Sequence, residues 1–274
     1  QGLLPGEDVL TTYRGITGAG EVDIYIPSMS MAFEFNGVYF HSDALGRDKM
    51  SHYNKFQSCE SAGVRLVVIW EDDWRDRRTV VEKMVTAKLG LSPRHSTGAR
   101  SLVCDDNVPH MEAANFLSRE HIQGAIRAAR YFGLRDSEGN LCALAAVSYR
   151  NGNAELSRYA SVSVIPGAFP RVMKRVRKSA RDHGAKVIVT YSDNAVSDGK
   201  LYASNGFSRV SEVPPKYGVV WRGSRHHVAS FKRKRFMSDL SLKYDANARL
   251  VDLYALNNMP RYWDYGKVRW ELSV

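Results

Sequence analysis

The sequence lacks any apolar run near the roughly 18 residues that a membrane-spanning helix needs, and no signal peptide opens it. It has only three cysteines, Cys59, Cys104 and Cys142, which are far apart and odd in number. We therefore expect no membrane partner and no disulfide framework, and the cysteine spacing fits no metal site. We interpret the cysteines as small, buried or half-buried residues in a reducing compartment. Because the chain starts with Gln1, we also expect that a piece is missing upstream.

The charge of the chain is divided unevenly along its 274 residues. Residues 1–95 contain 11 Lys and Arg against 13 Asp and Glu, a net charge of −2, and the remainder contains 28 against 16, a net charge of +12. A basic second half is typical of a domain that binds a polyanion, whereas the first half is suited to carboxylate chemistry. The alternative is that the basic residues only keep the second half soluble.

The first 95 residues have the pattern of a compact α/β domain. Residues 64–70, VRLVVIW, form a continuous apolar run that predicts a strand buried on both faces. Asn36-Gly37 predicts a turn or bulge in the preceding strand. We expect strands at residues 21–27, 31–40 and 64–70, and helices at residues 48–62 and 76–89.

A second α/β domain is expected at residues 108–235, after a linker at 96–107, and residues 236–274 form a C-terminal extension. Gly184 predicts the end of a basic helix, and the turn at residues 137–140 predicts a hairpin. We expect helices at residues 111–117, 169–183 and 199–204. Strands are expected at residues 128–134, 141–149, 155–160, 187–191 and 208–212, with strand-like segments at 250–254 and 267–272 in the extension.

Two carboxylates interrupt the apolar strands of the first domain. Asp23 and Glu34 lie on adjacent predicted strands, so they can converge on one Mg²⁺ (or Mn²⁺) ion, which prefers oxygen ligands. His41 follows the second strand and can act as a general acid or base, and His52 and Lys55 lie three residues apart on the next helix. The alternative is that both carboxylates face solvent on the polar side of alternating strands.

The segments EVDIYIP, MAFEFNGVYFHSD, HYNK and GVRLVVIWEDDW, within residues 20–90, resemble phage homing endonucleases related to the very-short-patch repair nuclease of the PD-(D/E)xK superfamily. The resemblance implies a restriction-endonuclease-like fold, with Asp23 and Glu34 as metal ligands and His41 as the catalytic histidine. It also matches His52 and Lys55 to catalytic positions, and the acidic pair Glu71 and Asp72 to a pair without an assigned role. It implies a phage-encoded enzyme that acts in the cytoplasm of a bacterial host, and a homodimer is compatible with it.

Two positions depart from this family. Asn36 replaces the lysine of the superfamily's ExK motif, and His41 or Lys55 would then supply its role. The repair-nuclease branch also uses a glutamate on a helix before the first strand, whereas Glu7 lies in LLPGEDV, a poor helix sequence. A truncated start would remove that ligand.

The second domain, over residues 108–235, resembles GNAT acyltransferases. The segment SDGKLYASNGF, residues 197–207, is similar to the helix and strand that pack beside the thioester in that family. VIPGAF, residues 164–169, lies where the family's pyrophosphate loop lies, but Val164 replaces a basic residue or Gln, and Pro166 removes an N–H donor. A GNAT-like fold is therefore expected together with a weak expectation of acyl transfer.

Two basic stretches belong to this second domain, at residues 171–186 and 222–235. Dense Lys and Arg neutralise phosphates, and neighbouring aromatic residues such as Trp221 and Phe231 can stack on bases. The alternative is a solvated surface. The candidate contacts to double-stranded DNA are Arg171, Lys174, Arg175, Arg177, Lys178, Arg225, Lys232, Arg233, Lys234 and Arg235.

These observations predict an α/β (α+β) chain with a restriction-endonuclease-like N-terminal domain and a GNAT-like, mixed-sheet C-terminal domain. The main hypothesis is a metal-dependent, site-specific DNA endonuclease. One alternative is a GNAT-like transferase that modifies DNA or protein. Another is a DNA-binding protein with an inactive nuclease fold.

Overall fold

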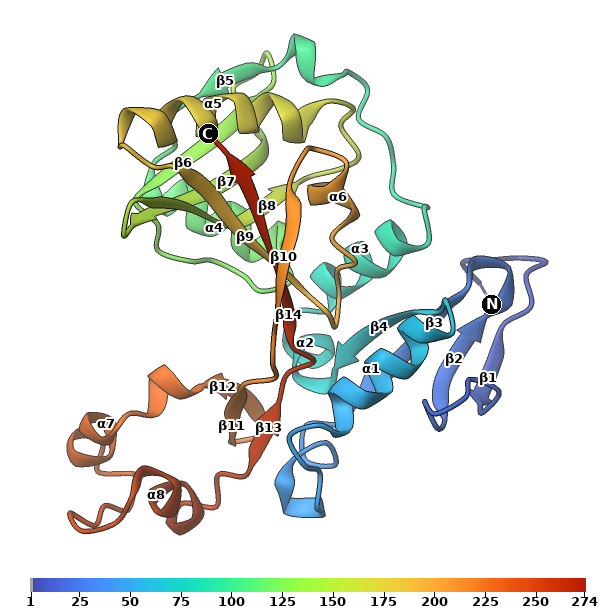
Figure 1. The fold of residues 1–274 in the computed structure, drawn as a ribbon, viewed down its shortest axis with the longest axis vertical. Helices are drawn as coiled ribbons and strands as arrows, with labels where there is room; N and C mark the ends of the chain where they lie inside the picture. Colours follow the sequence, from blue (N-terminus) through green and yellow to red (C-terminus); the bar gives the residue numbers. More distant parts are fainter. Residues whose placement is uncertain (1) are drawn as a thin grey trace. The chain divides into compact units, whose positions relative to one another are not determined.

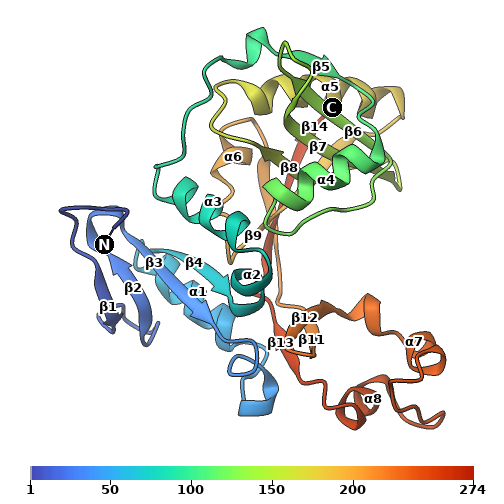
Figure 2. The same ribbon diagram turned by 180° about the vertical axis from the view of Figure 1, so that it is seen from behind.

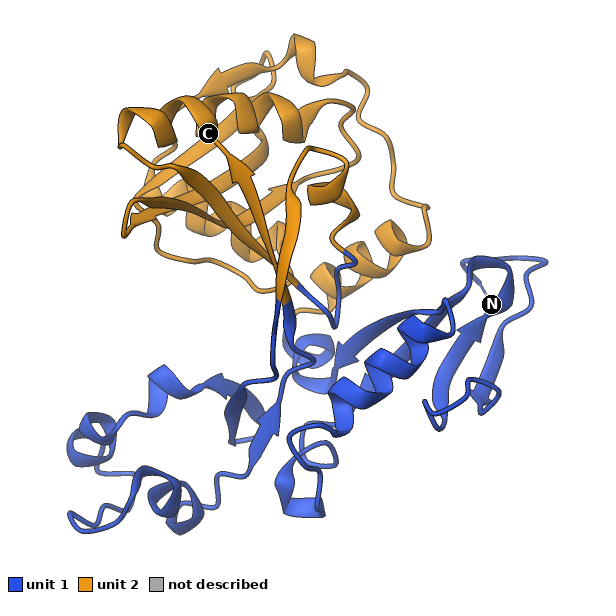
Figure 3. Ribbon diagram, in the orientation of Figure 1, with its two compact units in different colours: residues 1–76, 193–198, 212–267 blue, residues 77–192, 199–211, 268–274 orange. Residues whose placement is uncertain are grey.

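The computed structural model describes residues 2–274, which divide into two compact units, each built from separate stretches of the chain (Figure 3). Unit 1 comprises residues 1–76, 193–198 and 212–267, and unit 2 comprises residues 77–192, 199–211 and 268–274. These units cut across the continuous domains predicted at residues 1–95 and 108–235. The physical reason is that strands from distant parts of the chain complete each unit.

Unit 1 contains a four-stranded sheet in the order β1-β2-β3-β4 (Figure 1). β2 pairs antiparallel with β1 and with β3, whereas β3 and β4 pair in parallel. A parallel pair needs a crossover connection, and α1 lies within it. The elements are β1 (Leu10–Tyr13), β2 (Val22–Ile26), η1 (Pro27–Met29), β3 (Met31–Asn36), η2 (Asp43–Leu45), α1 (Ser51–Ser61), β4 (Arg65–Trp70) and α2 (Glu71–Asp76).

The core of unit 1 forms where α1 covers the sheet. Phe56 and Cys59 lie three residues apart on one face of α1 and are buried against β-strand residues that include Val22 and Leu66. Leu66, Val67 and Val68 are at most 2% exposed, which agrees with the buried strand predicted from the run at residues 64–70. The sequence pattern therefore positions the strands that carry the candidate carboxylates.

Residues 212–267 add a smaller body to unit 1, with its own three-stranded antiparallel sheet in the order β12-β11-β13. Its core includes Phe231, Phe236, Leu253 and Tyr254, all at most 2% exposed. The strand-like segment predicted at residues 250–254 is instead helix α8, because Arg249 and Asp252 form a capping box at its start. The elements are β11 (Tyr217–Trp221), β12 (Ser224–His227), η4 (Val228–Phe231), α7 (Arg233–Ser238), α8 (Leu250–Leu256) and β13 (Arg261–Trp263).

Unit 2 is built on a seven-stranded mixed sheet in the order β10-β14-β9-β8-β7-β6-β5. Within this sheet, adjacent strands from β5 to β8 pair antiparallel, whereas β8 and β9 pair in parallel. The elements are α3 (Arg78–Lys88), η3 (Ala99–Ser101), β5 (Val103–Asp105), α4 (His110–Glu120), β6 (Arg130–Arg135), β7 (Leu141–Arg150), β8 (Asn153–Ser161), α5 (Ala168–Asp182), β9 (Val187–Asp193), α6 (Lys200–Ala203), β10 (Ser208–Val213) and β14 (Lys267–Ser273).

Helices cover both faces of this sheet (Figures 1 and 2). On β7, Ala143 and Ala145 belong to the core that α5 covers, whereas the alternate residues Leu144 and Ala146 belong to the core that α4 covers. A strand buried on both faces reads as a continuous apolar run, and residues 141–147 are such a run.

The predicted linker at residues 96–107 is part of the fold of unit 2. It contains η3 and the edge strand β5, and Ala99 and Leu102 are at most 3% exposed within the core. The strand predicted at residues 267–272 is present as β14, but it lies inside the sheet between β9 and β10. Within residues 2–274, no helix is long and apolar enough to span a bilayer.

We predict that Gly199 is required for the packing of unit 2. Gly199 has a φ of +72°, and a Cβ there would lie 2.2 Å from the Trp270 ring. Gly199→Ala should lower the free energy of unfolding by about 2–4 kcal/mol, through left-handed strain and overpacking, as measured by urea denaturation. The matched control is Gly184→Ala, which has a φ of +70° and no atom within 4 Å, and should lose only about 1–2 kcal/mol. Equal losses would contradict the packing argument.

Candidate functional site

The strand pairing of β2 and β3 brings the two predicted metal ligands together. Ile24 pairs with Phe33, so Asp23 and Glu34 are the next positions along the two strands. The Asp23 carboxylate accepts a hydrogen bond from the Phe35 backbone N–H, at 2.6 Å. Glu34 is 6% exposed, so its carboxylate has little access to water.

Lys55 of α1 compensates the charge of Glu34. Its Nζ forms an ion pair with Glu34 Oε1 and donates a hydrogen bond to the Glu21 carbonyl. Glu34 Oε2 is buried without a hydrogen-bond partner. Burial raises the pKa of Glu34, although the positive charge of Lys55 opposes that shift. The predicted catalytic residues Asp23, Glu34 and Lys55 thus form one cluster, in which Lys55 is ion-paired with Glu34.

His41 and His52 form a hydrogen-bonded pair, with 3.1 Å between His41 Nδ1 and His52 Nε2. His52 Nδ1 lies 2.9 Å from the Trp263 carbonyl, which can only accept, so this nitrogen carries the proton and Nε2 accepts from His41. Burial lowers the pKa of His41 to about 4 and also lowers the pKa of His52. Both rings are therefore neutral at pH 7, and no hydrogen bond joins them to Asp23 or Glu34 in the described part of the chain.

The other positions matched to the nuclease family have partners within unit 1. Asn36 is fully buried and donates to the Tyr265 hydroxyl at 3.0 Å, in the place of the missing ExK lysine. Glu71 accepts a backbone N–H of the loop after β3, at 2.8 Å. The Asp72 carboxylate accepts from both the backbone and the side chain of Arg225. This acidic pair thereby fixes backbone and side-chain positions around β4.

Most of the cations predicted to contact DNA have an intramolecular partner. Of these ten cations, Lys174, Lys232 and Lys234 are exposed and have no side-chain hydrogen bond or ion pair with the residues that the structure describes. Arg225 also stacks over the Trp70 ring, at 4.4 Å. The partners are Leu102 for Arg171, Asp106 for Arg175, Ser273 for Arg177, Asp182 for Lys178, Asp72 and Asp73 for Arg225, Ala246 and Ala248 for Arg233, and Asp239 for Arg235.

Unit 2 contains a second candidate site where two parallel strands separate. The pairing of β8 with β9 ends at Leu156 and Thr190, and a bulge on β8 follows directly after Leu156. Thr190 Oγ1 donates to the Leu156 carbonyl at 2.9 Å, and Thr190 also lies close enough to the Tyr202 hydroxyl to affect its pKa. We call this place the β8–β9 divergence. The polar side chains of two strands and α6 meet there.

Electrostatics at the β8–β9 divergence keep Tyr202 protonated. Burial raises the pKa of the Tyr202 hydroxyl, against smaller opposing effects of Thr190 and the nearby Arg158. Tyr202 lies within residues 197–207, the segment that resembles GNAT acyltransferases, but the sequence did not single it out. It gave no signal for Arg158 or Thr190, because their role depends on where the two strands stop pairing.

Unit 2 has a mixed α/β fold, built on one mixed sheet in which the parallel pair β8 and β9 separates. Residues 212–267 are inserted into it between β10 and β14. The fold therefore needs the C-terminal strand, which lies outside the range 108–235 that the sequence resemblance covered.

No family model and no curated protein matches the chain. Similar solved structures include the IAA acetyltransferase from Bacillus cereus, with 12% identity, 64% of this chain and 100% of that chain covered, and a TM-score of 0.35. Nourseothricin acetyltransferase has 15% identity, covers 63% and 98%, and has a TM-score of 0.36. The ribosomal-protein-S18-alanine N-acetyltransferase from Escherichia coli has 12% identity, covers 63% and 95%, and has a TM-score of 0.36. These values by themselves assign no activity to the chain.

The predicted metal-dependent DNA endonuclease, a phosphodiester hydrolase of the phage homing group, is corrected by these findings. The similar solved structures are transferases. Within residues 2–274, no group of three or more His, Cys, Asp or Glu side chains is arranged to hold a metal ion. The physical reason lies in the site itself, where Lys55 forms an ion pair with Glu34 and one oxygen of Asp23 accepts the Phe35 N–H, so both carboxylates have partners other than a metal ion.

We predict that the buried carboxylate of Glu34 makes unit 1 less stable as the pH rises. Its pKa is raised in the folded state, so its favourable contribution is complete below about pH 4.5 and is lost as the pH rises through the folded-state pKa. The free energy of unfolding of Glu34→Gln should therefore increase relative to the wild type between pH 4.5 and 8, in urea denaturation. Glu60→Gln, at an exposed position of α1, is the control. A similar trend in both variants would contradict the role of burial.

Proposed function

We propose that unit 2 is a GNAT-like transferase that binds an acyl thioester of coenzyme A at the β8–β9 divergence. The observation that carries this proposal is the unpaired edge of β8. β8 continues to Ser161, whereas its pairing with β9 stops at Leu156. A strand edge without a partner offers backbone hydrogen bonds to an extended ligand such as a pantetheine arm.

The direction of the backbone amides supports a ligand on this edge. The Val162 N–H donates to Cys142 of β7 at 3.0 Å. Amide groups alternate between the two edges of a strand, so the N–H group of Ser161, the last residue of β8, faces the other edge, toward the gap left by β9. Ser163 Oγ, two residues beyond β8, is buried without a hydrogen-bond partner. These groups are suited to receive a polar ligand arm.

The loop after β8 has some, but not all, of the features that bind the phosphates of such a ligand. Gly167, with a φ of +79°, precedes the first turn of the 15-residue helix α5, where free N–H groups and the helix dipole favour an anion. Pro166 and Pro170 each remove one N–H donor from this region, and Val164 contributes no charge. This loop should therefore bind a pyrophosphate less tightly than a loop in which every residue has a backbone N–H.

Tyr202 has the properties of a proton donor at this site. Transfer of an acyl group breaks a carbon–sulfur bond, and the departing sulfur needs a proton. The Tyr202 hydroxyl stays protonated at neutral pH because burial raises its pKa, and it lies near Thr190 at the β8–β9 divergence. Arg158, on β8 just after the bulge, adds positive charge to the same place.

We predict that the 274-residue chain binds acetyl-CoA in calorimetry and that Tyr202→Phe keeps this binding. Thiol release from acetyl-CoA, measured with a panel of amine acceptors and DNA, should fall by about 10²–10⁴-fold in Tyr202→Phe, because a general acid is lost. Tyr149→Phe is the matched control, since Tyr149 stacks on His183 and bonds Ser179 elsewhere in unit 2. Absence of acetyl-CoA binding at millimolar ligand would overturn the proposal.

A second candidate function is binding of double-stranded DNA by residues 212–267. This segment contains 11 Lys and Arg against 5 Asp and Glu, a net charge of +6. Lys232 and Lys234 alternate with Arg233, which donates to backbone carbonyls, and with Arg235, which pairs with Asp239, and both lysines are exposed. Exposed cations that have no carboxylate partner are available to neutralise phosphates.

We predict that Lys232→Gln with Lys234→Gln lowers the slope of log K against log[salt] by about 1.8 for duplex DNA, since each phosphate contact contributes about 0.9. Fluorescence anisotropy at several salt concentrations measures this slope. Lys174→Gln tests whether α5 of unit 2 shares the contact. An unchanged slope in the double variant would show that these lysines only face solvent.

We also propose that the four-stranded sheet of unit 1 has a restriction-endonuclease-like fold. This proposal concerns the fold alone and assigns no activity to the sheet. The support is an antiparallel β2–β3 pair followed by α1 and the parallel strand β4.

A further inference from the structure

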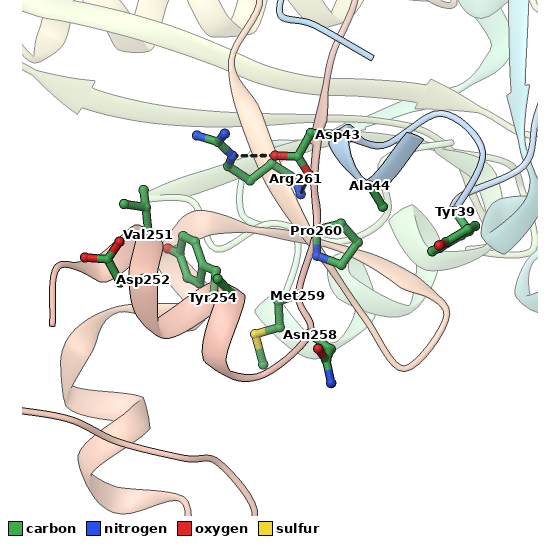
Figure 4. Close-up of a pocket in the computed structure, with 11 residues that line it drawn as sticks. Tyr39, Asp43, Ala44, Val251, Asp252, Tyr254, Asn258, Met259, Pro260 and Arg261 are labelled. Carbon is green, nitrogen blue, oxygen red and sulfur yellow. Dashed lines mark hydrogen bonds and ion pairs between the residues drawn. The ribbon is translucent and has the colours of Figure 1, made fainter. Parts of the chain in front are cut away.

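Unit 1 contains a cavity of about 680 Å³ between the loop that holds η2 and helix α8, which we call the α8 cavity (Figure 4). In Figure 4, Tyr39 and Ala44 lie on one side, Val251 and Tyr254 lie on the other, and Pro260 lies between them. Its volume is within the range of small-molecule sites, about 300–1,000 Å³. The lining residues are Tyr39, Asp43, Ala44, Val251, Asp252, Tyr254, Ala255, Asn258, Met259, Pro260 and Arg261.

The shape and polarity of the α8 cavity suit a flat, apolar ring. Tyr254 and Met259 form a buried floor, at most 2% exposed. Tyr39 is 54% exposed at the rim, so its ring is accessible for stacking. Pro260 and Ala255 add further apolar surface between the floor and the rim.

The charged residues of the cavity wall are already paired. Asp43 accepts from the backbone N–H and from Nε of Arg261, at 2.7 and 2.8 Å. Asp252 pairs with Arg249 at the start of α8. The polar groups left for a ligand are the Tyr39 hydroxyl and the Asn258 amide, for which the described residues provide no side-chain partner. Both are neutral and can donate and accept, so the ligand part inside the cavity is a neutral ring with a hydrogen-bonding edge.

Positive charge lies beside this neutral cavity. Asn257, which precedes Asn258, makes two hydrogen bonds with the backbone of Lys243, at 2.7 and 2.9 Å, so Lys243 is held next to the cavity. Lys243 is exposed. A neutral ring site with a cation beside it matches a nucleotide, which has a flat base and an anionic phosphate.

We propose that the α8 cavity binds one unpaired nucleobase of a DNA strand whose phosphates contact Lys243. This inference rests on the second candidate function, binding of DNA by residues 212–267. Removing a base from a paired stack costs a few kcal/mol, whereas a base that is already unpaired avoids that cost. The cavity therefore gives the protein a preference for DNA with an unpaired nucleotide.

The test compares a duplex with a single bulged nucleotide and the same duplex fully paired, by fluorescence anisotropy with the full chain. The wild type should bind the bulged duplex at least about tenfold tighter. Ala255→Trp, which fills the cavity from α8, should abolish this preference and leave the affinity for paired DNA within about twofold. Leu256→Trp is the matched control, because Leu256 is 42% exposed on the same helix and does not line the cavity.

Asn258→Gly provides a second variant in which misfolding is not expected. Asn258 has a φ of +52°, a conformation that glycine adopts without strain, so this variant removes the amide and spares the backbone. It should reduce the preference for the bulged duplex without filling the cavity. Equal affinity of the wild type for both duplexes, or a preference that survives Ala255→Trp, would overturn the proposal while duplex binding stands. Absence of salt-dependent binding to either duplex would overturn the DNA function as well.

Discussion

The seven-stranded sheet of unit 2 depends on the insertion of β14 between β9 and β10. Trp270 fixes this strand, since its Nε1 donates to Ser192 Oγ of β9 at 2.9 Å and its ring packs against Gly199 and Tyr202. β9 ends at residue 193 and β14 begins at residue 267, so the sheet closes only through a contact between distant parts of the chain. Such non-local pairing is slow to form. The strand order of unit 2 therefore depends on a segment that lies more than 70 residues after β9 in the sequence.

In unit 1, the compensation of buried charge decides what the polar residues can do. A carboxylate removed from water needs a partner, and Lys55 provides one for Glu34. The same constraint applies to Arg225, whose guanidinium meets Asp72 and Asp73 while it stacks on Trp70. Residues that appear in the sequence as catalytic acids or DNA-binding cations therefore also serve to hold unit 1 together.

The sequence predicts the individual strands and helices of this protein better than it predicts which of them lie side by side. The apolar run of β4 and the basic helix α5 are recognisable because burial imposes their patterns directly on the residues. The segment at residues 250–254 was mistaken for a strand because five residues carry too little periodicity to separate strand from helix. The capping box that decides it uses Arg249 and Asp252, a pair that no simple capping motif describes.

The candidate sites show the same limit. Asp23, Glu34 and Lys55 could be grouped from the sequence, because adjacent strands and the helix that follows them bring nearby residues together. Arg158 and Thr190 could not be grouped, since their proximity depends on where β8 and β9 stop pairing. Lys55 also shows that proximity alone does not define chemistry. A lysine beside a glutamate fits both a catalytic pair and a structural ion pair, and only burial and the remaining partners distinguish them.

The division of the chain between the two units restricts how their functions can be separated. Residues 193–198 and 212–267 belong to unit 1, whereas residues 199–211 and 268–274 belong to unit 2. Any truncation that keeps one unit therefore removes strands of that unit or leaves segments of the other without their core. A fragment ending at residue 235 would lack β14, and with it the strand between β9 and β10. The chemistry of each unit has to be separated by single side chains in the complete chain, because loss of activity in a fragment would report only the loss of its sheet.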